Sequence, residues 1–368
     1  MTPSRVRSVR ITFVTPPFDL SGGQRVIATY AARLQKRGHH VVVVSPPHPT
    51  PSARSIIRSI IRSRCWPDRN SASHFDRVPV ERCVLSRYRP VLDADVPDAD
   101  VVVATWWETA EWVAALSPRK GAKVHFMQDY EIWGGSQDRV DATCRFPMPK
   151  IVIARWVEKL LADQFGVKAA AFIPDSVETE TFYAPPRAKQ IRPTFGLTYT
   201  QFANKGCDIC LAAVARARRE VPEIRLIAFG SARPNASLPF PEDGEFHFRA
   251  PDAKLKDIYA SCDAWLFGTR IEAFGLPILE AMACRTPVIG TPAGAAPELL
   301  GAGGGWLVPP ENPEEMAAAI VRLCRLPDAE WRAMSDAAYS IATRYSWDDA
   351  TNLFERALMA ARDQPKST

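Results

Sequence analysis

The sequence predicts an α/β protein with two domains, each a parallel sheet flanked by helices. Short apolar runs alternate with longer amphipathic segments, which is the pattern of parallel strands joined by helical crossovers. With 368 residues, the chain is long enough for two domains that each bury a core. The basic, proline-containing stretch 185–193 separates two such alternating regions. We therefore expect one domain before this stretch and another after it.

Composition and charge exclude several classes of protein. A net charge of +5 is modest for this length and argues against a nucleic-acid binder, in which basic residues gather on one face. The eight scattered cysteines indicate a reducing cytoplasm rather than a disulfide framework. Cys207 and Cys210 lack the further ligands that zinc needs and are expected to be buried in a helix. No apolar run is long enough to span a membrane, and the N-terminal residues indicate a strand rather than a signal peptide.

The first region opens with strand, helix and strand. Residues 9–15 form the first expected strand, 24–37 the helix and 41–45 the second strand. Gly22 and Gly23 lie where the first strand leads into the helix, and their missing side chains let a ligand approach the backbone amides. A flexible turn is the alternative interpretation.

Residues 54–64 interrupt this alternation with a basic, amphipathic pattern. Isoleucines share one helical face, while Arg54, Arg58 and Arg62 share a neighbouring stripe. Such a helix can lie on an anionic membrane, so peripheral contact with the inner face of the cell membrane is one expectation. The other is a helix packed on its own domain with its arginines in solvent.

Aromatic and polar residues follow two further strands, 101–105 and 123–127. Open α/β sheets bind ligands at the carboxyl ends of their strands. The residues at these two ends are Trp106, Trp107, Gln128, Asp129, Tyr130 and Glu131. The tryptophans can stack on a sugar or fill the core, and core is expected for one of them. His125, within the second strand, is expected to be a core histidine with satisfied hydrogen bonds.

The second region contains the most informative stretch, from Gly268 to Glu298. Its pattern predicts a loop, a helix over 278–283 and a strand over 287–290. Glu272 in the loop and Glu280 in the helix are separated by seven residues. A carboxylate on the helix can accept two hydrogen bonds from a vicinal diol such as a ribose. Two glutamates at this spacing are also common on the surface of a single helix, which is the alternative.

Two helix starts in this region can bind an anion. The backbone N–H groups of Phe274, Gly275 and Leu276 begin the helix of the central stretch, and the first amides of a helix lack intrahelical partners. Lys205 opens an earlier helix, so its ammonium and the helix N-terminus can address one diphosphate. A solvated lysine is the alternative. No Asp-x-Asp segment lies at a strand end, where it would suggest a divalent-ion site, so no metal is expected.

The central stretch resembles the E-x7-E signature of family 4 retaining glycosyltransferases, which have the GT-B fold. The likeness includes the sequences FGLPILEAMA and PVIG and residues 304–320. It implies two Rossmann-like domains whose parallel sheets face each other across a deep cleft, with a last helix that returns to the first domain. The expected domains are then 1–186 plus 345–368 on the acceptor side and 187–344 on the nucleotide-sugar side.

The resemblance also implies roles for residues of the donor site. Glu280 would hold the ribose, Glu272 would face the donor sugar, and the amides of 274–276 would lie along sugar and diphosphate. Gly22 and Gly23 resemble the loop that closes over the donor diphosphate and the acceptor. The family commonly has an Arg shortly before the lysine, where Tyr199, Thr200 and Gln201 stand here. Either Arg270 supplies this second positive charge, or diphosphate binding differs.

On the acceptor side the resemblance is to a narrower group. Many members have a His-Asp pair where Gln128-Asp129 stands here, so an acid or base role for this pair is in doubt. The sequence QDYE resembles rhamnosyltransferases of bacterial surface polysaccharide synthesis that use a deoxythymidine-diphosphate sugar. Gln128, Tyr130 and Trp106 are the expected acceptor ligands. Asp129, with Glu272 and Lys205, is a candidate catalytic residue.

The expected activity is that of a cytoplasmic, cofactor-independent retaining glycosyltransferase. It would move a sugar, such as rhamnose from its deoxythymidine-diphosphate donor, to a saccharide or lipid-linked acceptor. One alternative is a GT-B epimerase that acts on the nucleotide sugar itself and needs no acceptor. The other is a non-catalytic scaffold that binds nucleotide sugars, which the absent histidine and displaced arginine would favour.

Overall fold

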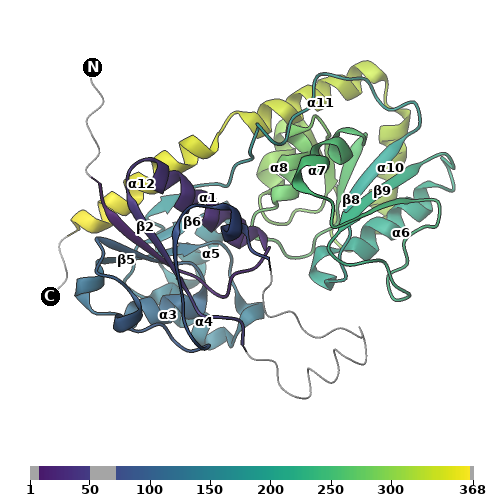
Figure 1. Cartoon of the computed structure of the whole chain (residues 1–368). Helices are drawn as coiled ribbons and strands as arrows, with labels where there is room; N and C mark the ends of the chain where they lie inside the picture. The colour runs from purple at the N-terminus through teal and green to yellow at the C-terminus, as the bar shows by residue number, and fades with distance from the viewer. Residues whose placement is uncertain (1–7, 50–71, 365–368) are drawn as a thin grey trace, which may run out of the picture. The chain divides into compact units, whose positions relative to one another are not determined.

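The computed structural model describes residues 8–49 and 72–364, which divide into two compact units (Figure 1). Unit 1 runs to Ile173 and resumes at Thr351, and unit 2 comprises Pro174–Ala350. The basic helix expected over 54–64 lies outside the described residues. Within the described ranges, no helix combines the length and apolar character that a membrane span requires.

Unit 1 contains a seven-stranded parallel sheet in the order β3-β2-β1-β4-β5-β6-β7. Its strands are β1 (Arg10–Val14), β2 (His40–Ser45), β3 (Glu81–Val84), β4 (Val101–Ala104), β5 (Ala122–Met127), β6 (Lys150–Val152) and β7 (Ala171–Phe172). Its helices are α1 (Gly22–Lys36), α3 (Trp107–Ala115), α4 (Gln137–Arg145), α5 (Arg155–Phe165) and most of α12 (Trp347–Asp363). Short 3-10 helices are η1 (His74–Arg77), η2 (Asp93–Asp95), η3 (Pro118–Lys120) and η4 (Ile132–Gly134).

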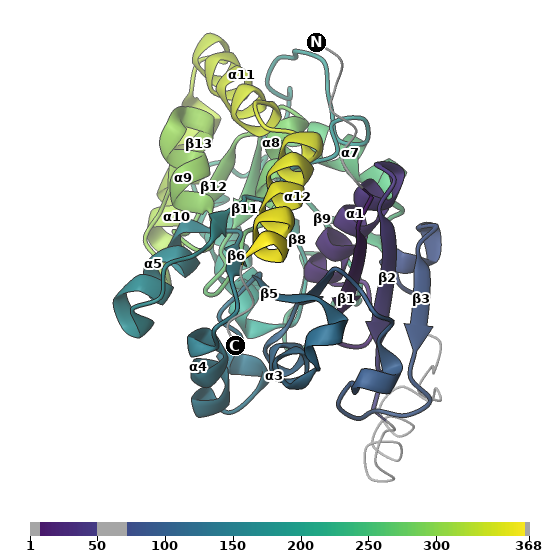
Figure 2. The same ribbon diagram turned by 90° about the vertical axis from the view of Figure 1, so that its left-hand side faces the viewer.

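Helices cover both faces of the unit 1 sheet. On one face, the ring of Tyr30 in α1 stacks at 4.2 Å on Phe354 of α12, and Phe354 also contacts Phe13 of β1 and Phe126 of β5. Helix α12 therefore completes this core although it follows unit 2 in the sequence (Figure 2). On the other face, α3 packs against the valines of β1, β2 and β4. The predicted parallel α/β class is confirmed for this unit.

Unit 2 contains a six-stranded parallel sheet in the order β10-β9-β8-β11-β12-β13. Its strands are β8 (Thr194–Thr198), β9 (Arg225–Gly230), β10 (Glu245–Phe248), β11 (Ala264–Phe267), β12 (Val288–Gly290) and β13 (Gly305–Leu307). Its helices are α6 (Cys207–Ala217), α7 (Asp252–Ala260), α8 (Leu276–Ala283), α9 (Ala296–Leu299), α10 (Pro313–Arg325) and α11 (Asp328–Thr343). Two further short helices are η5 (Ala203–Lys205) and the π-type η6 (Leu300–Gly304).

The unit 2 sheet is also covered on both faces. Helices α6 and α10 bury their apolar residues against one face, where Leu197 and Leu266 lie in the same core cluster. On the other face, Trp265 of β11 stacks on Phe229 of β9 at 5.4 Å and contacts Tyr259 of α7 at 4.4 Å. These aromatic contacts fix α7 beside the central strand, and α7 and α8 carry residues of the candidate site described below.

The stretch 185–193, expected to be a linker, is bonded to unit 2. The ammonium of Lys189 donates to three carbonyl oxygens at the end of α10, those of Leu323, Cys324 and Leu326. A cation is favourable there because the last carbonyls of a helix lack intrahelical partners. Arg285 also donates to the carbonyl oxygen of Ala184 at 3.1 Å. The compact units therefore meet at 173/174 and 350/351, whereas the domains predicted from the sequence meet at 186/187 and 344/345.

His125 is buried in β5, as expected, but its hydrogen bonds are not satisfied. Neither ring nitrogen has a partner among the described residues, so that part of the prediction is wrong. On the neighbouring strand, the Lys150 ammonium donates to the carbonyl oxygens of Phe146 and Met148, at 2.6 and 3.0 Å, and not to the ring. Burial, and then the charge of Lys150, lowers the pKa of His125 to about 3.

Acid should therefore destabilise the protein through His125. The unfolded histidine titrates near pH 6.5 and the folded one near 3, so the stability contributed by the neutral ring is present above pH 6.5 and lost as the pH falls toward 3. The expected loss at pH 5 is about 2 kcal/mol. Between pH 7 and pH 5, the free energy of unfolding of His125→Leu should fall by about 2 kcal/mol less than that of the wild type. Urea unfolding at the two pH values measures this difference. The same pH dependence in both proteins would contradict this account.

Candidate functional site

The centre of the unit 2 sheet is a point where the chain changes direction. Strands β8 and β11 are neighbours, and the chain winds outward from them through β9 and β10 on one side and β12 and β13 on the other. In open parallel sheets, ligands bind at such a switch point, outside the carboxyl ends of the strands. The loops at this point are 199–206 after β8 and 268–275 after β11.

Backbone contacts join these two loops. The N–H groups of Arg270 and Ile271 donate to the carbonyl oxygen of Asn204 at 2.8 and 3.2 Å. Gly206 has a φ of +58°, and a Cβ atom on it would lie 1.8 Å from the carbonyl oxygen of Gly268. Glycine is therefore required at position 206, because any side chain would push the loops apart.

The junction brings Lys205 and Glu272 together, two residues predicted from the sequence. The Lys205 ammonium lies 2.9 Å from Oε2 of Glu272. The lysine side chain is 37% exposed and the glutamate side chain 14% exposed. An ammonium has three N–H groups, so Lys205 can keep this partner and donate to a second anion from the solvent side.

Arg270 lies at the same junction but is already occupied. Its guanidinium forms ion pairs with Asp208 and Glu311 and donates to the carbonyl oxygen of Ala203. These contacts use all five N–H groups of an arginine. The hydrogen bond to Asp208, and then that to Glu311, raises the pKa of Arg270. In this arrangement Arg270 has no donor left for a diphosphate, so its expected role as a second cation stays a prediction that requires one of these contacts to open.

Glu280 is buried in α8, with 4% of its surface exposed. Its Oε2 accepts a hydrogen bond from the hydroxyl of Tyr259 at 2.7 Å. The alternative that both glutamates are surface residues of one helix is therefore wrong, since Glu280 is buried and Glu272 precedes the helix. A buried carboxylate needs hydrogen-bond donors, and the hydroxyls of a bound ribose would be suitable ones.

Helix α8 begins with unpaired backbone amides. Gly275, with a φ of +103°, precedes the first helical residue, and Pro277 occupies the first turn, where its missing N–H costs no intrahelical bond. Among the described residues, no acceptor contacts the N–H groups of Phe274, Gly275 or Leu276. These amides are available to an anion or a hydroxyl, and their role in donor binding stays a prediction.

Unit 1 has its own switch point, between β1 and β4. Gly22 and Gly23 form the first turn of α1, and Ser21 caps this helix by accepting from the N–H group of Gln24 at 3.4 Å. A Cβ atom on Gly23 would lie 3.4 Å from the side chain of Gln128, which follows β5. The structure thus brings Gly23 and Gln128 together, two residues that the sequence analysis assigned to donor and acceptor.

The polar residues after β5 are bonded largely within unit 1. Asp129 accepts from the N–H group of Tyr130 at 2.8 Å and from the indole N–H of Trp133 at 3.3 Å. The hydroxyl of Tyr130 donates to Asp141 of α4 at 2.5 Å. Burial, and then this hydrogen bond, raises the pKa of Tyr130 to about 12. Tyr130 is a neutral phenol held by α4, and its role as an acceptor ligand stays a prediction.

Three tryptophans gather near this loop. Trp107 is buried and Trp106 is half-buried, so the expectation that one of the pair fills the core is confirmed. The ring of Trp106 lies 5.0 Å from that of Trp133, which is 63% exposed and which the sequence analysis did not single out. Gly134 and Gly135 let the loop pass over the indoles, because Cβ atoms there would lie 2.4 and 2.3 Å from the rings of Trp106 and Trp107. Trp133 is therefore held as an exposed aromatic surface suited to stacking on a sugar.

The two cysteines of α6 are buried in the core of unit 2. Cys207 and Cys210 are buried on α6, as predicted, and burial raises the pKa of the Cys207 thiol to about 11. In residues 8–49 and 72–364, no group of three or more His, Cys, Asp and Glu side chains is placed to hold a metal ion.

Sequence comparisons match the part of the chain that carries the unit 2 junction. The family described as Glycosyl transferases group 1 matches residues 194–325, which include Lys205, Glu272 and Glu280. A D-inositol 3-phosphate glycosyltransferase from Segniliparus rotundus is 32% identical over 156 residues, which are 39% of this chain and 34% of that protein. O-antigen chain mannosyltransferase B from Escherichia coli is 33% identical over 102 residues, 27% of this chain and 26% of that protein. The matched regions therefore span 34% and 26% of the length of these curated relatives.

Solved structures match nearly the whole chain. Sucrose-phosphate synthase from Thermosynechococcus elongatus aligns with a TM-score of 0.70 at 16% identity, covering 96% of this chain and 100% of that one. Anabaena HepE in complex with UDP and glucose aligns with a TM-score of 0.72 at 17% identity and the same coverage. At this identity the likeness shows the fold alone. Residues 194–325 thus form a group 1 glycosyl transferase domain, in a chain that has the GT-B fold of two Rossmann-like domains.

Proposed function

We propose that the protein is a retaining glycosyltransferase that moves a sugar from a nucleotide-diphosphate donor to a saccharide or lipid-linked acceptor. The observation that carries this proposal is the junction at the unit 2 switch point. There the Lys205–Glu272 ion pair, the unpaired amides before α8 and the buried Glu280 lie on two joined loops and the helix that follows them. The match of this region to group 1 glycosyl transferases supports the same function.

Each part of the junction offers one kind of contact to a nucleotide sugar. Glu280 would accept hydrogen bonds from the ribose, and Glu272 would accept them from the hydroxyls of the donor sugar. The Lys205 ammonium would lie against the leaving diphosphate. The N–H groups of 274–276 would donate to the diphosphate and the sugar, as the resemblance to family 4 implies.

The chemistry follows from the charge that develops during transfer. The bond between the anomeric carbon and the diphosphate oxygen breaks, its electron pair leaves with the diphosphate, and the sugar acquires oxocarbenium character. An acceptor hydroxyl attacks the same face and gives its proton to an oxygen of the leaving phosphate. Lys205 and the helix amides stabilise the growing negative charge, so they act more strongly in the transition state than in the ground state. Asp129 and Glu272 are the carboxylates that can assist this step.

Different observations point to the identity of the donor sugar and of the acceptor. The name of the Escherichia coli relative favours mannose as the donor sugar, whereas the resemblance carried by Gln128 to Glu131 favours rhamnose. Both sugars fit surface polysaccharide synthesis. The exposed Trp133, in edge-to-face contact with Trp106, supports a saccharide on the acceptor side. Peripheral binding to the membrane rests on the basic segment 54–64 alone.

A screen of nucleotide sugars tests the proposal. We expect GDP-mannose, UDP-glucose or dTDP-L-rhamnose to raise Tm, because a ligand that binds only the folded state stabilises it. The stabilising donor is then incubated with saccharide acceptors, and NMR of the product should show the anomeric configuration of the donor. An altered nucleotide sugar formed without acceptor would instead indicate an epimerase, and binding without turnover a scaffold. No stabilisation by any nucleotide sugar would contradict the proposal.

A further inference from the structure

Two arginines lie over one phenyl ring at the carboxyl edge of the unit 2 sheet. Phe248 is the last residue of β10 and is 37% exposed. The guanidinium carbon of Arg233, in the loop after β9, lies 4.5 Å from the ring centroid, and that of Arg249 lies 5.2 Å from it. The two guanidinium groups are therefore within about 10 Å of each other.

Neither guanidinium has an acidic partner. In the part of the chain that the structure describes, no carboxylate forms an ion pair or hydrogen bond with Arg233 or Arg249. By contrast, Arg225 on the adjacent strand is paired with Glu245. Both arginines are exposed, so each can reach an anion in solvent. An anion bound by both arginines would give each guanidinium the acidic partner that the described residues do not supply.

The backbone of Arg249 adopts a conformation that a side chain disfavours. Its φ is +49°, in the left-handed region, and its N–H group donates to the carbonyl oxygen of Gly230 at 2.8 Å. Glycine would adopt this conformation without the cost that a Cβ atom imposes. Strain of this kind persists most often at functional positions, and here it places a guanidinium over Phe248.

The arginine pair borders the loop that carries Lys205. Strands β10, β9 and β8 are neighbours in that order, with about 4.8 Å between adjacent strands. The side-chain amide of Gln201, in the loop after β8, donates to the carbonyl oxygen of Arg233 at 3.1 Å. Lys205 follows Gln201 in the same loop. Arg233 is thus in contact with one side of the switch point, and Arg249 lies over the same phenyl ring.

We propose that Arg233 and Arg249 bind the phosphates of the nucleotide donor, an inference that rests on the proposed function. A guanidinium presents paired N–H groups that match two phosphate oxygens, and stacking on Phe248 leaves those edges available. Lys205 shares its charge with Glu272, and Arg270 has no donor left. This pair can supply the positive charge that Arg270 does not.

Calorimetry with UDP, GDP and dTDP, and with the corresponding nucleosides, tests the inference. Arg233→Gln and Arg249→Gln keep hydrogen-bonding capacity but remove the charge. Each is expected to weaken binding of the best nucleoside diphosphate by about tenfold or more, the range for hydrogen bonds between charged groups, and to reduce the salt dependence of binding. Binding of the nucleoside should change little, because it has no phosphate.

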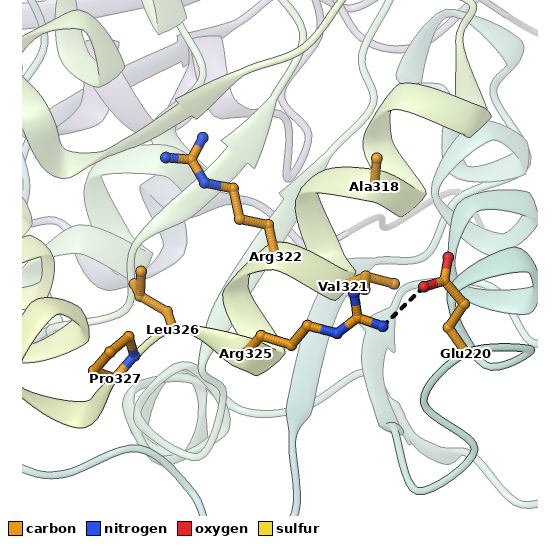
Figure 3. A pocket seen from close by; sticks show the side chains of 7 residues that line it. All are labelled: Glu220, Ala318, Val321, Arg322, Arg325, Leu326 and Pro327. Atoms are coloured by element: carbon orange, nitrogen blue, oxygen red, sulfur yellow. Dashed lines mark hydrogen bonds and ion pairs between the residues drawn. The ribbon is translucent and has the colours of Figure 1, made fainter.

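Arg322 provides a matched control on the same unit. It is exposed, lies 4.4 Å over the ring of Trp306, and lines a surface pocket on α10 with Arg325 and Glu220 (Figure 3). Arg322→Gln removes a stacked arginine of the same kind, so wild-type affinity is expected.

The outcomes separate the inference from the proposed function. If the wild type binds a nucleoside diphosphate and both Arg233→Gln and Arg249→Gln bind it equally well, the inference is overturned while the proposed function stands. Equal losses for nucleoside and nucleoside diphosphate would also overturn it, since the arginines would then act on the base. A wild-type protein that binds none of the three diphosphates would overturn both.

Discussion

Lys205→Ala is expected to lower kcat by about 100- to 1,000-fold, the usual effect of removing one preorganised electrostatic group from an active site. The Lys205 ammonium has one carboxylate partner and is accessible to solvent, whereas the guanidinium of Arg270 is fully engaged. Negative charge on the diphosphate grows as the sugar bond breaks, so the loss should fall on kcat as well as on binding. Steady-state rates with the stabilising donor and its acceptor measure the effect.

Glu272 and Arg270 supply the comparisons for this variant. In Lys205→Ala, the Glu272 carboxylate stays beside the phosphate site without its partner, so adding Glu272→Gln should restore part of the donor affinity if repulsion causes the loss. Arg270→Ala should mainly lower Tm, because Arg270 joins three segments. A matching kcat loss at unchanged Tm would instead make Arg270 the second cation. Near-normal kcat in Lys205→Ala would show that the diphosphate is held elsewhere.

Glu280→Ala is expected to weaken binding of the nucleoside diphosphate by roughly 10- to 150-fold, because hydrogen bonds to a charged acceptor contribute about 1.5 to 3 kcal/mol. The carboxylate is buried and accepts from the hydroxyl of Tyr259, so its removal also takes this acceptor from the tyrosine and should lower Tm. Calorimetry on the folded variant separates the two effects.

The sugar of the nucleotide provides the control for Glu280. UDP offers two ribose hydroxyls and 2′-deoxy-UDP offers one, so a wild-type protein that uses Glu280 for the ribose should bind UDP more tightly. Glu280→Ala should abolish that preference. Tyr259→Phe keeps the Glu280 carboxylate, so this variant should still prefer UDP to 2′-deoxy-UDP. Unchanged UDP affinity in folded Glu280→Ala would remove Glu280 from the site.

In unit 1 the central strands could be predicted from the sequence, and the edge strands β3 and β7 could not. A strand buried on both faces of a parallel sheet is a continuous apolar run, and β1, β2, β4 and β5 each lie within one residue of their predicted bounds. Strand β3 lies at the edge, and all four of its residues, Glu81–Val84, are exposed. Strand β7 has two residues. Neither leaves a hydrophobic pattern that sequence analysis can detect.

The site was predictable where it is local and unpredictable where it depends on contacts between distant segments. The loop and helix from Glu272 to Glu280 follow from local sequence, including the glycine and proline that begin the helix. The ion pair between Lys205 and Glu272 joins residues 67 positions apart and depends on which loops the strand order brings together. For the same reason, sequence analysis offered Arg270 as one possible source of a second positive charge without showing its acidic partners, and it left Arg233 unnoticed.

Phe354 is translated after all of unit 2, yet its ring contacts Phe13, Tyr30 and Phe126 in the core of unit 1. Domains generally fold as units while they emerge from the ribosome. The core of unit 1 therefore stays incomplete, with the part of its sheet beside α1 that α12 covers still exposed, until the whole of unit 2 has been synthesised and the last helix emerges. During that interval the nascent chain presents to chaperones the surface that α12 later covers.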